Sequence, residues 1–572
     1  MKRQLLRWGL VTSLVAMSLI LIVVCVGSRA QETPGGRLVA GVVRDPQGQP
    51  VQGANLTLSS AGQPEPVAEA TTQANGGYAL PISGTVPSTL TLQVSRPHFE
   101  QKTIDLDSKQ ISQLQAGDSV VLPEITLARR ITAAFWVATA IFVAMLVLIA
   151  TGTLHNTLAA LLGASLVFAV SYLGSPLVPD LFIFQFSNGL AYVDWNVIFL
   201  IMGMMIIIAV VERTGIFQWL ALMAYRLSGG RPWLLLAILM FITSVASALL
   251  DNVTTMLLMT PITIQIALAI GINPLALLLP ELMTSNVAGI STLIGTPTNI
   301  LIGSFASISF NDFLINQTPG VLLAIAGIMI YSLVIYRKQL LPPEASDVPA
   351  QLMEKLVERA HITEPSHLRK AAWIGAGMLV LFVLGENIHL LPGVTALMGA
   401  TALLVWIRPD IEEMIEAVDW TTLVFFITLF VVVGAVQEVG LISLIATAIG
   451  NVVKQNLILA MLVVTWASAL LSMVIANIPF TAAMLPVVGF LTASIPAANS
   501  KVLFYCLSVG SAMGGNGSLI GASANMVTAG IAERAGHPMS YVFFLRKGLP
   551  ALFISVSLAT VWLLLRFLVL GG

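Results

Sequence analysis

Apolar residues dominate the chain from Ile131 to its C-terminus, where they form runs of about twenty positions between short polar segments. An α-helix of ~20 apolar residues spans the hydrocarbon core of a bilayer, so each such run predicts a transmembrane helix. Several runs are interrupted by Gly, Pro or polar residues. The pattern therefore predicts an all-α polytopic membrane protein in which some helices are broken.

Residues 36–127 follow a different pattern, in which apolar and polar residues alternate. The stretches GRLVAGVVRDPQGQPVQGANLTL and STLTLQVSRPHFEQKTIDL alternate with a period of two around Pro, Gly and Asn turn signals. We predict a small all-β sandwich of six or seven short strands for this segment, ahead of the membrane part.

Residues 1–30 combine a basic start, an apolar stretch, and the small residues Ser28 and Ala30 at the positions that a signal peptidase recognises. This pattern predicts a cleaved signal peptide, which would place the β-sandwich outside the cytoplasm and the helices in the plasma membrane. The alternative is an uncleaved anchor helix, because the apolar stretch is long for a signal.

Composition narrows the classes of function. The chain of 572 residues is 57% hydrophobic and 10% charged, with a net charge of -1 and no basic patch for a nucleic acid. Its two cysteines, Cys25 and Cys506, lie in apolar runs and form no disulfide framework or metal-ligand set. No nucleotide-binding loop and no catalytic constellation is present. We expect no enzyme activity, no metal and no cofactor beyond a coupling ion, H⁺ or Na⁺.

The membrane part contains an internal repeat. Val193-Asp194-Trp195 recurs as Val418-Asp419-Trp420, 225 positions later, and TLIGTPTN (292–299) recurs as SLIGASAN (518–525), 226 positions later. Chance matching of apolar helices gives Leu-on-Leu hits, not polar landmarks in one register. The predicted organisation is the following: leading transmembrane helices 131–192, transport repeat 193–336, cytoplasmic linker 337–370, connecting helices 371–416, and a second transport repeat 417–570.

Basic residues predict the orientation of these copies. Lys and Arg gather in the linker and at Arg226 and Arg231, so both regions are predicted to be cytoplasmic. The first copy then starts its first helix outside and the second copy starts inside. This is an inverted-topology repeat, which is typical of secondary transporters.

Each copy contains two polar interruptions. The first is Asp251-Asn252-Val253-Thr254, matched by Ala476-Asn477-Ile478-Pro479; the second is Gly295 to Asn299, matched by Gly521 to Asn525. Broken backbone at membrane depth is tolerated where it is buried in protein or lines a cavity, so these segments predict a substrate and ion site; the alternative is that they are packing kinks. The candidate binding residues are Asp251, Asn252, Thr254, Thr255, Asn286, Gly295, Thr296, Pro297, Asn299, Asn477, Pro479, Thr481, Asn516, Ser518, Gly521, Ser523 and Asn525.

Two acidic residues are candidates for proton or cation coupling, Asp251 and Glu281. An acidic or basic side chain at the bilayer centre costs about 2.5–3.5 kcal/mol on insertion scales, so each one indicates a function. Asp251 is the stronger candidate because its repeat partner is Ala476. The interrupted segments carry no Lys or Arg, so an anion would be held by helix N-termini, amides and hydroxyls, with co-bound cations. Glu212 and Glu438 end apolar runs and are expected to be ordinary interfacial charges.

The segments SALLDNVTTMLLMTPITI, ELMTSNVAGISTLIGTPTNILIGS and GSAMGGNGSLIGASANMVTAGIAERAG resemble the ion transporter superfamily, which includes ArsB arsenite permeases, NhaD sodium/proton antiporters and citrate-transporter-like permeases. They are most similar to its P-protein branch. The resemblance covers residues 194–549 and implies two re-entrant hairpins, a homodimer and an elevator-like movement. GVVRDPQGQPVQGANLTL and NGGYAL resemble the carboxypeptidase regulatory-like domain, which implies a binding or spacer module.

One motif departs from the P-protein branch, which usually has Gly-Asp-Pro-Pro-Asn where this chain has Gly295-Thr296-Pro297-Thr298-Asn299. Thr296 restores a hydroxyl found in carboxylate symporters, so neither branch transfers its substrate directly. We predict an ion-coupled permease for a small anion, oxyanion or carboxylate, in contact with membrane lipid. The alternatives are a sodium/proton antiporter and, from another class, a non-transporting receptor or anchor for the β-sandwich; a channel is a weaker third.

Overall fold

The structure, a computed structural model, describes residues 37–46, 48, 50–60, 65–340, 361–498 and 500–571. They form two compact units, one within Met1–Arg130 and the other within Ile131–Gly572. The predicted signal peptide and the central part of the predicted linker lie outside the described residues. The linker prediction extended to residue 370, whereas helix α14 already begins at Pro365.

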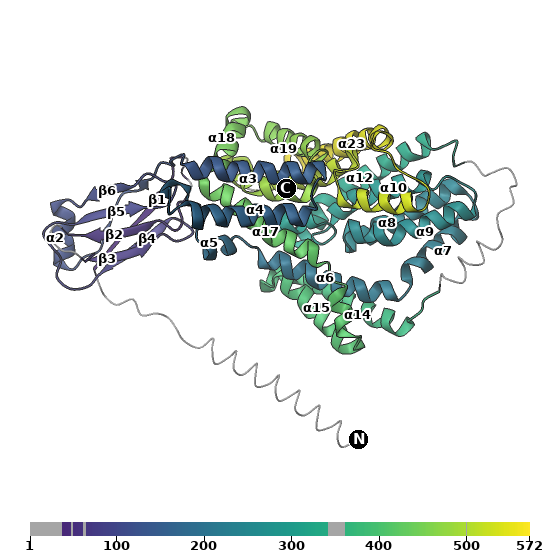
Figure 1. Ribbon diagram of the computed structural model, residues 1–572, viewed down its shortest axis with the longest axis horizontal. Coiled ribbons are helices and arrows are strands. Elements are labelled where there is room, and N and C mark those ends of the chain that lie inside the picture. Colours follow the sequence, from purple (N-terminus) through teal and green to yellow (C-terminus); the bar gives the residue numbers. More distant parts are fainter. Residues whose placement is uncertain are drawn as a thin grey trace, which may run out of the picture. The chain divides into compact units, whose positions relative to one another are not determined.

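The first unit is a sandwich of two small sheets (Figure 1). In one sheet β1 pairs antiparallel with β4 and parallel with both β7 and β8, and in the other the order is β3-β2-β5-β6 with antiparallel pairing throughout. The prediction of a small β-sandwich is confirmed. The strands are β1 (Arg37–Arg44), β2 (Asn55–Ser59), β3 (Ala68–Thr71), β4 (Gly77–Ile82), β5 (Thr91–Ser95), β6 (Lys102–Asp105), β7 (Val120–Val121) and β8 (Ile125–Thr126).

This unit also contains a helix that the strand pattern did not predict, α2 (Ser108–Ala116). A capping box fixes its start: Gln110 N–H donates to Asp107 Oδ1 at 2.7 Å, and Asp107 N–H donates to Gln110 Oε1 at 2.9 Å. Asp followed three positions later by Gln was therefore the missed signal.

Alternating burial fills the core between the two sheets. On β4, Tyr78, Leu80 and Ile82 point inward, while Ala79 and Pro81 do not. The hydroxyl of Tyr78 is buried without a hydrogen-bond partner, and this burial raises the pKa of Tyr78 to about 12. Tyr78 lies where a Cβ at Gly41 would approach its hydroxyl to 2.6 Å, so glycine at 41 gives the ring its place.

The second unit is helical, and ten of its described helices are long and apolar enough to cross a membrane. The predicted all-α polytopic architecture is confirmed. The first half comprises α3 (Ala133–Thr151), α4 (Asn156–Ala169), η1 (Val170–Gly174), η2 (Pro179–Leu181), α5 (Phe186–Ala191), α6 (Trp195–Arg213), α7 (Ile216–Ser228), α8 (Pro232–Leu249), α9 (Asn252–Ala269), α10 (Leu275–Ala288), η3 (Gly289–Ser291), α11 (Pro297–Ala306) and α12 (Phe310–Ile335).

The second half repeats this series of elements. It comprises α14 (Pro365–Leu384), η4 (Gly385–Ile388), α15 (Pro392–Ile407), α16 (Ile411–Glu416), α17 (Trp420–Val439), α18 (Leu441–Val453), α19 (Leu457–Ser472), α20 (Asn477–Ser494), η5 (Pro496–Ala498), α21 (Val502–Gly514), η6 (Gly515–Gly517), α22 (Ser523–Arg534), α23 (Tyr541–Leu564) and η7 (Leu565–Val569). From α6 and α17 onward the principal helices match in order and closely in length. The sequence repeat is thus also a repeat of local structure.

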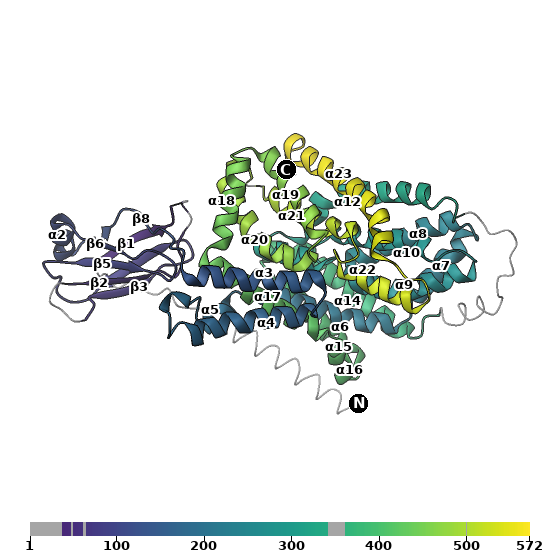
Figure 2. The ribbon, with the colours of Figure 1, turned by 45° about the horizontal axis from the view of Figure 1, so that its top comes forward.

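Packing between the halves is reciprocal. Helices α3 and α4 pack on α17 of the second half, and α14 and α15 pack on α6 of the first (Figure 1). In the same way α9 packs on α22 (Figure 2), and α20 packs on α11. Helices of each half therefore cover helices of the other, and the interrupted segments of both halves come together in the interior of the unit.

Candidate functional site

The first interruption lies between α8 and α9, and Asp251 forms its tip. Its Oδ1 accepts a hydrogen bond from Thr254 N–H at 2.8 Å, and its Oδ2 accepts one from the Thr254 hydroxyl at 2.5 Å. Asp251 is therefore the N-cap of α9, placed where a negative charge interacts favourably with the helix dipole. The side chain is half-buried, while the next residue, Asn252, is buried.

The matching tip in the second half has no charged cap. Ala476 stands at the N-cap position of α20 and supplies no side-chain hydrogen bond. Asn477 begins the helix and is buried, and its carbonyl oxygen accepts a hydrogen bond from the Thr481 hydroxyl at 2.7 Å. The two tips share the break and the asparagine, but only the first carries a carboxylate.

The second interruption joins α10 to α11 through a tight loop. The Thr292 hydroxyl donates to the carbonyl of Ala248 at 2.5 Å and accepts from Gly295 N–H at 3.1 Å. A Cβ at Gly295 would lie 2.6 Å from the Gly289 carbonyl oxygen and 2.7 Å from that of Ser247. Glycine is needed here because backbone meets backbone.

The loop between α21 and α22 repeats these contacts. The Ser518 hydroxyl donates to the carbonyl of Met473 and accepts from Gly521 N–H at 3.2 Å. The Ser472 hydroxyl donates to the Ser511 carbonyl at 2.6 Å, just as the Ser247 hydroxyl donates to the Ser285 carbonyl at 2.8 Å. These bonds tie each hairpin tip to the broken helix of its own half.

Two asparagines close these loops from inside. Asn299 Nδ2 donates to the carbonyls of Ile290 and Thr292 at 2.9 and 2.8 Å. Asn525 Nδ2 donates to those of Gly515 and Ser518 at 2.7 and 2.8 Å. Each amide satisfies backbone oxygens that the helix break leaves free.

A network of four buried asparagines joins the two halves. Asn286 Oδ1 accepts from Asn252 Nδ2 at 2.8 Å, and Asn286 Nδ2 donates to Asn516 Oδ1 at 2.9 Å and to Asn525 Oδ1 at 3.0 Å. Asn516 Nδ2 donates in turn to the carbonyl of Met283 at 3.1 Å. We call Asn252, Asn286, Asn516 and Asn525 the asparagine network. It links the first tip to both broken helices.

A cavity of about 540 Å³ lies beside the two tips and the starts of α11 and α22. From the first half it is lined by Asp251, Thr254 and Pro297, and from the second by Ile478 and Ser523. The opposite wall belongs to the helices that pack across the halves, and it includes His155, Asn156, Thr157, Glu212, Asp419, Thr421 and Thr422.

The predicted site residues thus separate into two sets. Those that line the cavity are Asp251, Thr254, Pro297 and Ser523. The others lie off its lining, in buried positions of the tips, loops and helices: Asn252, Thr255, Glu281, Asn286, Gly295, Thr296, Asn299, Asn477, Pro479, Thr481, Asn516, Ser518, Gly521 and Asn525. Thr296 stands at the N-cap position of α11 without a side-chain capping bond, and its hydroxyl and that of Thr298 share a hydrogen bond of 3.2 Å.

Sequence reasoning missed the opposite wall. Thr157 donates its hydroxyl to the carbonyl of Thr421 at 2.9 Å, and Asp419 accepts hydrogen bonds from the hydroxyls of Thr421 and Thr422. His155 is exposed and lines the cavity. The repeated Val-Asp-Trp landmark at Asp419 was the available signal.

The charged residues that line the cavity are all acidic, apart from one histidine. Its wall carries the carboxylates of Glu212, Asp251 and Asp419, one histidine, and no Lys or Arg. Within the described part of the chain, no group of three or more His, Cys, Asp or Glu residues is placed to hold a metal ion. The N-termini of α11 and α22, at Pro297 and Ser523, also reach this wall, so positive helix ends face it beside the carboxylates.

These features define a membrane transport protein: the helix breaks are paired, a polar network lies in the interior, and the two repeated halves share the wall of one cavity. The family model described as citrate transporter matches residues 145–499, which is more than half of the chain. The chain belongs to this citrate transporter family, so membership of the transporter superfamily expected from the motifs is confirmed. Residues 39–128 match the carboxypeptidase regulatory-like domain, as expected.

The chain is similar in sequence to two further proteins and in structure to a third. An uncharacterized transporter of Mycobacterium tuberculosis is 36% identical over 435 residues, which is 76% of this chain and 99% of the relative. The human P protein is 33% identical over 514 residues, covering 76% of this chain and 60% of the P protein. The solved structure of Neisseria gonorrhoeae MtrF aligns with 77% of this chain and 96% of its own, with a TM-score of 0.49 and 13% identity.

Proposed function

We propose that the protein is a cation-coupled secondary transporter that moves a small anion, such as a carboxylate or oxyanion, by an elevator-like alternating-access movement. The observation that carries this proposal is the meeting of both tips and both broken-helix loops at one polar interior. Such breaks serve transport, because a receptor or anchor needs only continuous helices.

Chemistry at the cavity supports an anion held without basic side chains. Helices α11 and α22 point their N-termini at the wall, and free N–H groups at helix starts bind anions. The hydroxyls of Thr254 and Ser523 can donate to the same anion. Asp251 would repel it unless a cation is bound or the carboxyl is protonated, which supplies a physical basis for coupling.

The orientation and assembly belong to the same proposal. The two halves run in opposite directions across the plasma membrane, with the basic linker in the cytoplasm and the β-sandwich outside. The basic loop residues support this orientation. The protein works as a homodimer, as the resemblance to the superfamily implies. In each subunit the region from α8 to α12, which contains the first tip, moves against helices α6, α14 and α15.

A sodium/proton antiporter is the second candidate. It is favoured by the three carboxylates of the cavity wall, which have no Lys or Arg beside them on that wall. Carboxylate and hydroxyl oxygens suit a hard monovalent cation, and an antiporter would carry Na⁺ and H⁺ in turn at Asp251.

Flux into proteoliposomes separates these candidates. The purified full-length protein is reconstituted and given imposed H⁺ or Na⁺ gradients with arsenite, citrate, sulfate, or no anion. Saturable anion uptake that depends on a cation gradient supports the permease. Sodium-driven proton movement without any anion supports the antiporter, and flux that neither saturates nor depends on a gradient would refute both.

A further inference from the structure

Glu281 is an acidic side chain in the middle of α10 that the cavity does not reach. Its exposed fraction is 0%, and α10 is enclosed by α8, α9, α12, α21, α22 and α23. It is not among the residues that line the cavity of Asp251 and Ser523, so it does not contact that space directly.

The carboxyl group is incompletely paired. The Thr243 hydroxyl of α8 donates to Glu281 Oε1 at 3.2 Å, while Oε2 is buried and has no hydrogen-bond partner. Thr263 of α9 lies against the same carboxyl group, but its buried hydroxyl also forms no hydrogen bond of normal geometry. An ionised carboxylate in this place would have only two neutral hydroxyls, those of Thr243 and Thr263, as donors.

No charge compensates Glu281. Neither α8 nor α9 contains an Asp, Glu, Lys, Arg or His, and α10 contains only Glu281 itself. The titratable residues of the other enclosing helices interact elsewhere or lie near exposed helix ends, and none adds a charge interaction at Glu281. They are Asp312 and Tyr331 on α12, Tyr505 and Cys506 on α21, Glu533 and Arg534 on α22, and Tyr541, Arg546 and Lys547 on α23.

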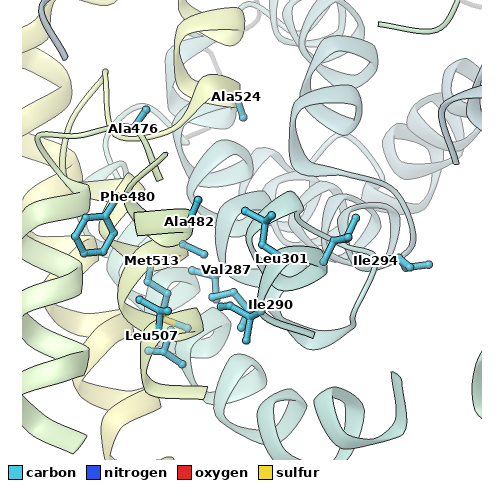
Figure 3. Packing of buried hydrophobic residues seen from close by; sticks show 14 of the residues in the cluster. Val287, Ile290, Ile294, Leu301, Ala476, Phe480, Ala482, Leu507, Met513 and Ala524 are labelled. Atoms are coloured by element: carbon cyan, nitrogen blue, oxygen red, sulfur yellow. The ribbon is translucent and has the colours of Figure 1, made fainter. Parts of the chain in front are cut away.

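The second half of the molecule shows what packing alone requires here. Leu507 occupies the equivalent position on α21, 226 residues later, and is fully buried in the hydrophobic cluster (Figure 3). Ser468 on α19 stands where Thr243 stands on α8. A leucine therefore satisfies the same helix pair, and the carboxyl group of Glu281 is not needed for packing.

We propose that Glu281 is a proton-binding site, neutral in this conformation, whose proton exchanges during the transport cycle. A proton on Oε2 turns this unpaired acceptor into a donor, and the Thr263 hydroxyl is the adjacent unpaired oxygen that can accept from it. A sodium ion fits less well, because it needs several oxygen ligands and a space, and only one carboxyl and two hydroxyls converge here.

The position of Glu281 explains how its proton could be coupled to the substrate tip. The pair Thr243–Glu281 lies one helical turn from the pair Ser247–Ser285 on the same two helices. The Ser285 hydroxyl also reaches the carbonyl of Asn252 in the first tip at 3.4 Å. If α8 separates from α10, the same movement exposes the proton of Glu281 to water and releases the tip. This inference rests on the proposed transport function.

Infrared spectroscopy on the purified full-length protein tests the bound proton without any substrate. The carbonyl band of a protonated carboxyl should be present in the wild type near neutral pH and in Asp251→Asn, and it should be lost in Glu281→Gln. If the band is absent from the wild type, or is unchanged in Glu281→Gln, the proposal is overturned. This result holds whether or not the proposed transport function is correct.

Transport tests the exchange of that proton. With labelled citrate, arsenite or sulfate, whichever the wild type takes up, Glu281→Gln should keep counterflow without a gradient but lose at least tenfold of proton-driven accumulation. Normal proton-driven accumulation would refute the proposal. Glu281→Leu introduces the residue that the second half has at the equivalent position, Leu507, and should behave in the same way. This second variant keeps the test valid if Glu281→Gln misfolds. If the wild type carries none of these anions, the proposed function fails separately, and the infrared band still decides proton binding.

Discussion

Replacing Asn286 with alanine tests whether the asparagine network holds the two halves together. The Asn286 amide is 2% exposed, and its loss removes one acceptor and two donors at once. Asn252 Nδ2, Asn516 Oδ1 and Asn525 Oδ1 would each lose a partner in the interior. The position is free to vary in principle, because its equivalent in the second half is Ala512.

The size of the effect follows from these three atoms. Leaving one buried polar atom unsatisfied costs about 1–3 kcal/mol, so three of them give about 3–9 kcal/mol. Water that enters the space of the lost amide can restore some bonds, so we expect a loss of about 3–5 kcal/mol, in the lower part of this range. Ser508→Ala is the matched control, since it removes only the 2.6 Å bond from Ser508 Oγ to Asn299 Oδ1, at about 1–3 kcal/mol.

Thermal unfolding of the purified variants in one detergent measures the difference. Membrane proteins of this size often unfold irreversibly, so melting temperatures are compared at one scan rate and used as a ranking. Asn286→Ala should lower the melting temperature by at least twice as much as Ser508→Ala. Equal shifts would refute the network as a cooperative unit, because they would mean that water or neighbouring groups satisfy all three atoms.

Three further changes have sharp expected outcomes. Gly295→Ala should destabilise the protein by about 1–3 kcal/mol in thermal melting, because its Cβ would clash with the Gly289 carbonyl, whereas Gly530→Ala, which meets nothing within 4 Å, should not destabilise it. Asp251→Asn should keep the melting temperature, since Asn also caps helices, but should abolish the cation dependence of flux; a variant with normal cation dependence would make Asp251 structural. Burial raises the pKa of Tyr78 from 10.0 to about 12, so the contribution of this tyrosine to stability is complete below pH 10.0 and is lost as the pH rises toward about 12. In ultraviolet titration, the wild type should show one more late-ionising tyrosine than Tyr78→Phe. Identical titration curves would contradict this prediction.

Local sequence determined the class, the breaks and the repeat. Many runs of about twenty residues that are apolar all round cannot all be buried in one protein core, so the polytopic membrane fold follows from the hydropathy pattern. Gly295 and Pro297 stand close together among polar residues inside an apolar run, so the interruption was also visible in the sequence. The repeat needed only the spacing of landmarks such as Asn252 and Asn477.

Tertiary structure decided which polar residue faces which environment. Asp251, the N-cap of α9, faces the cavity, while Asn252, the first residue of the helix, bonds Asn286 in the interior. This choice depends on how α9 docks on α10 and α22. Asp419 joins the same cavity from a helix that is far away in sequence. Its place depends on packing between the halves, which no local pattern records.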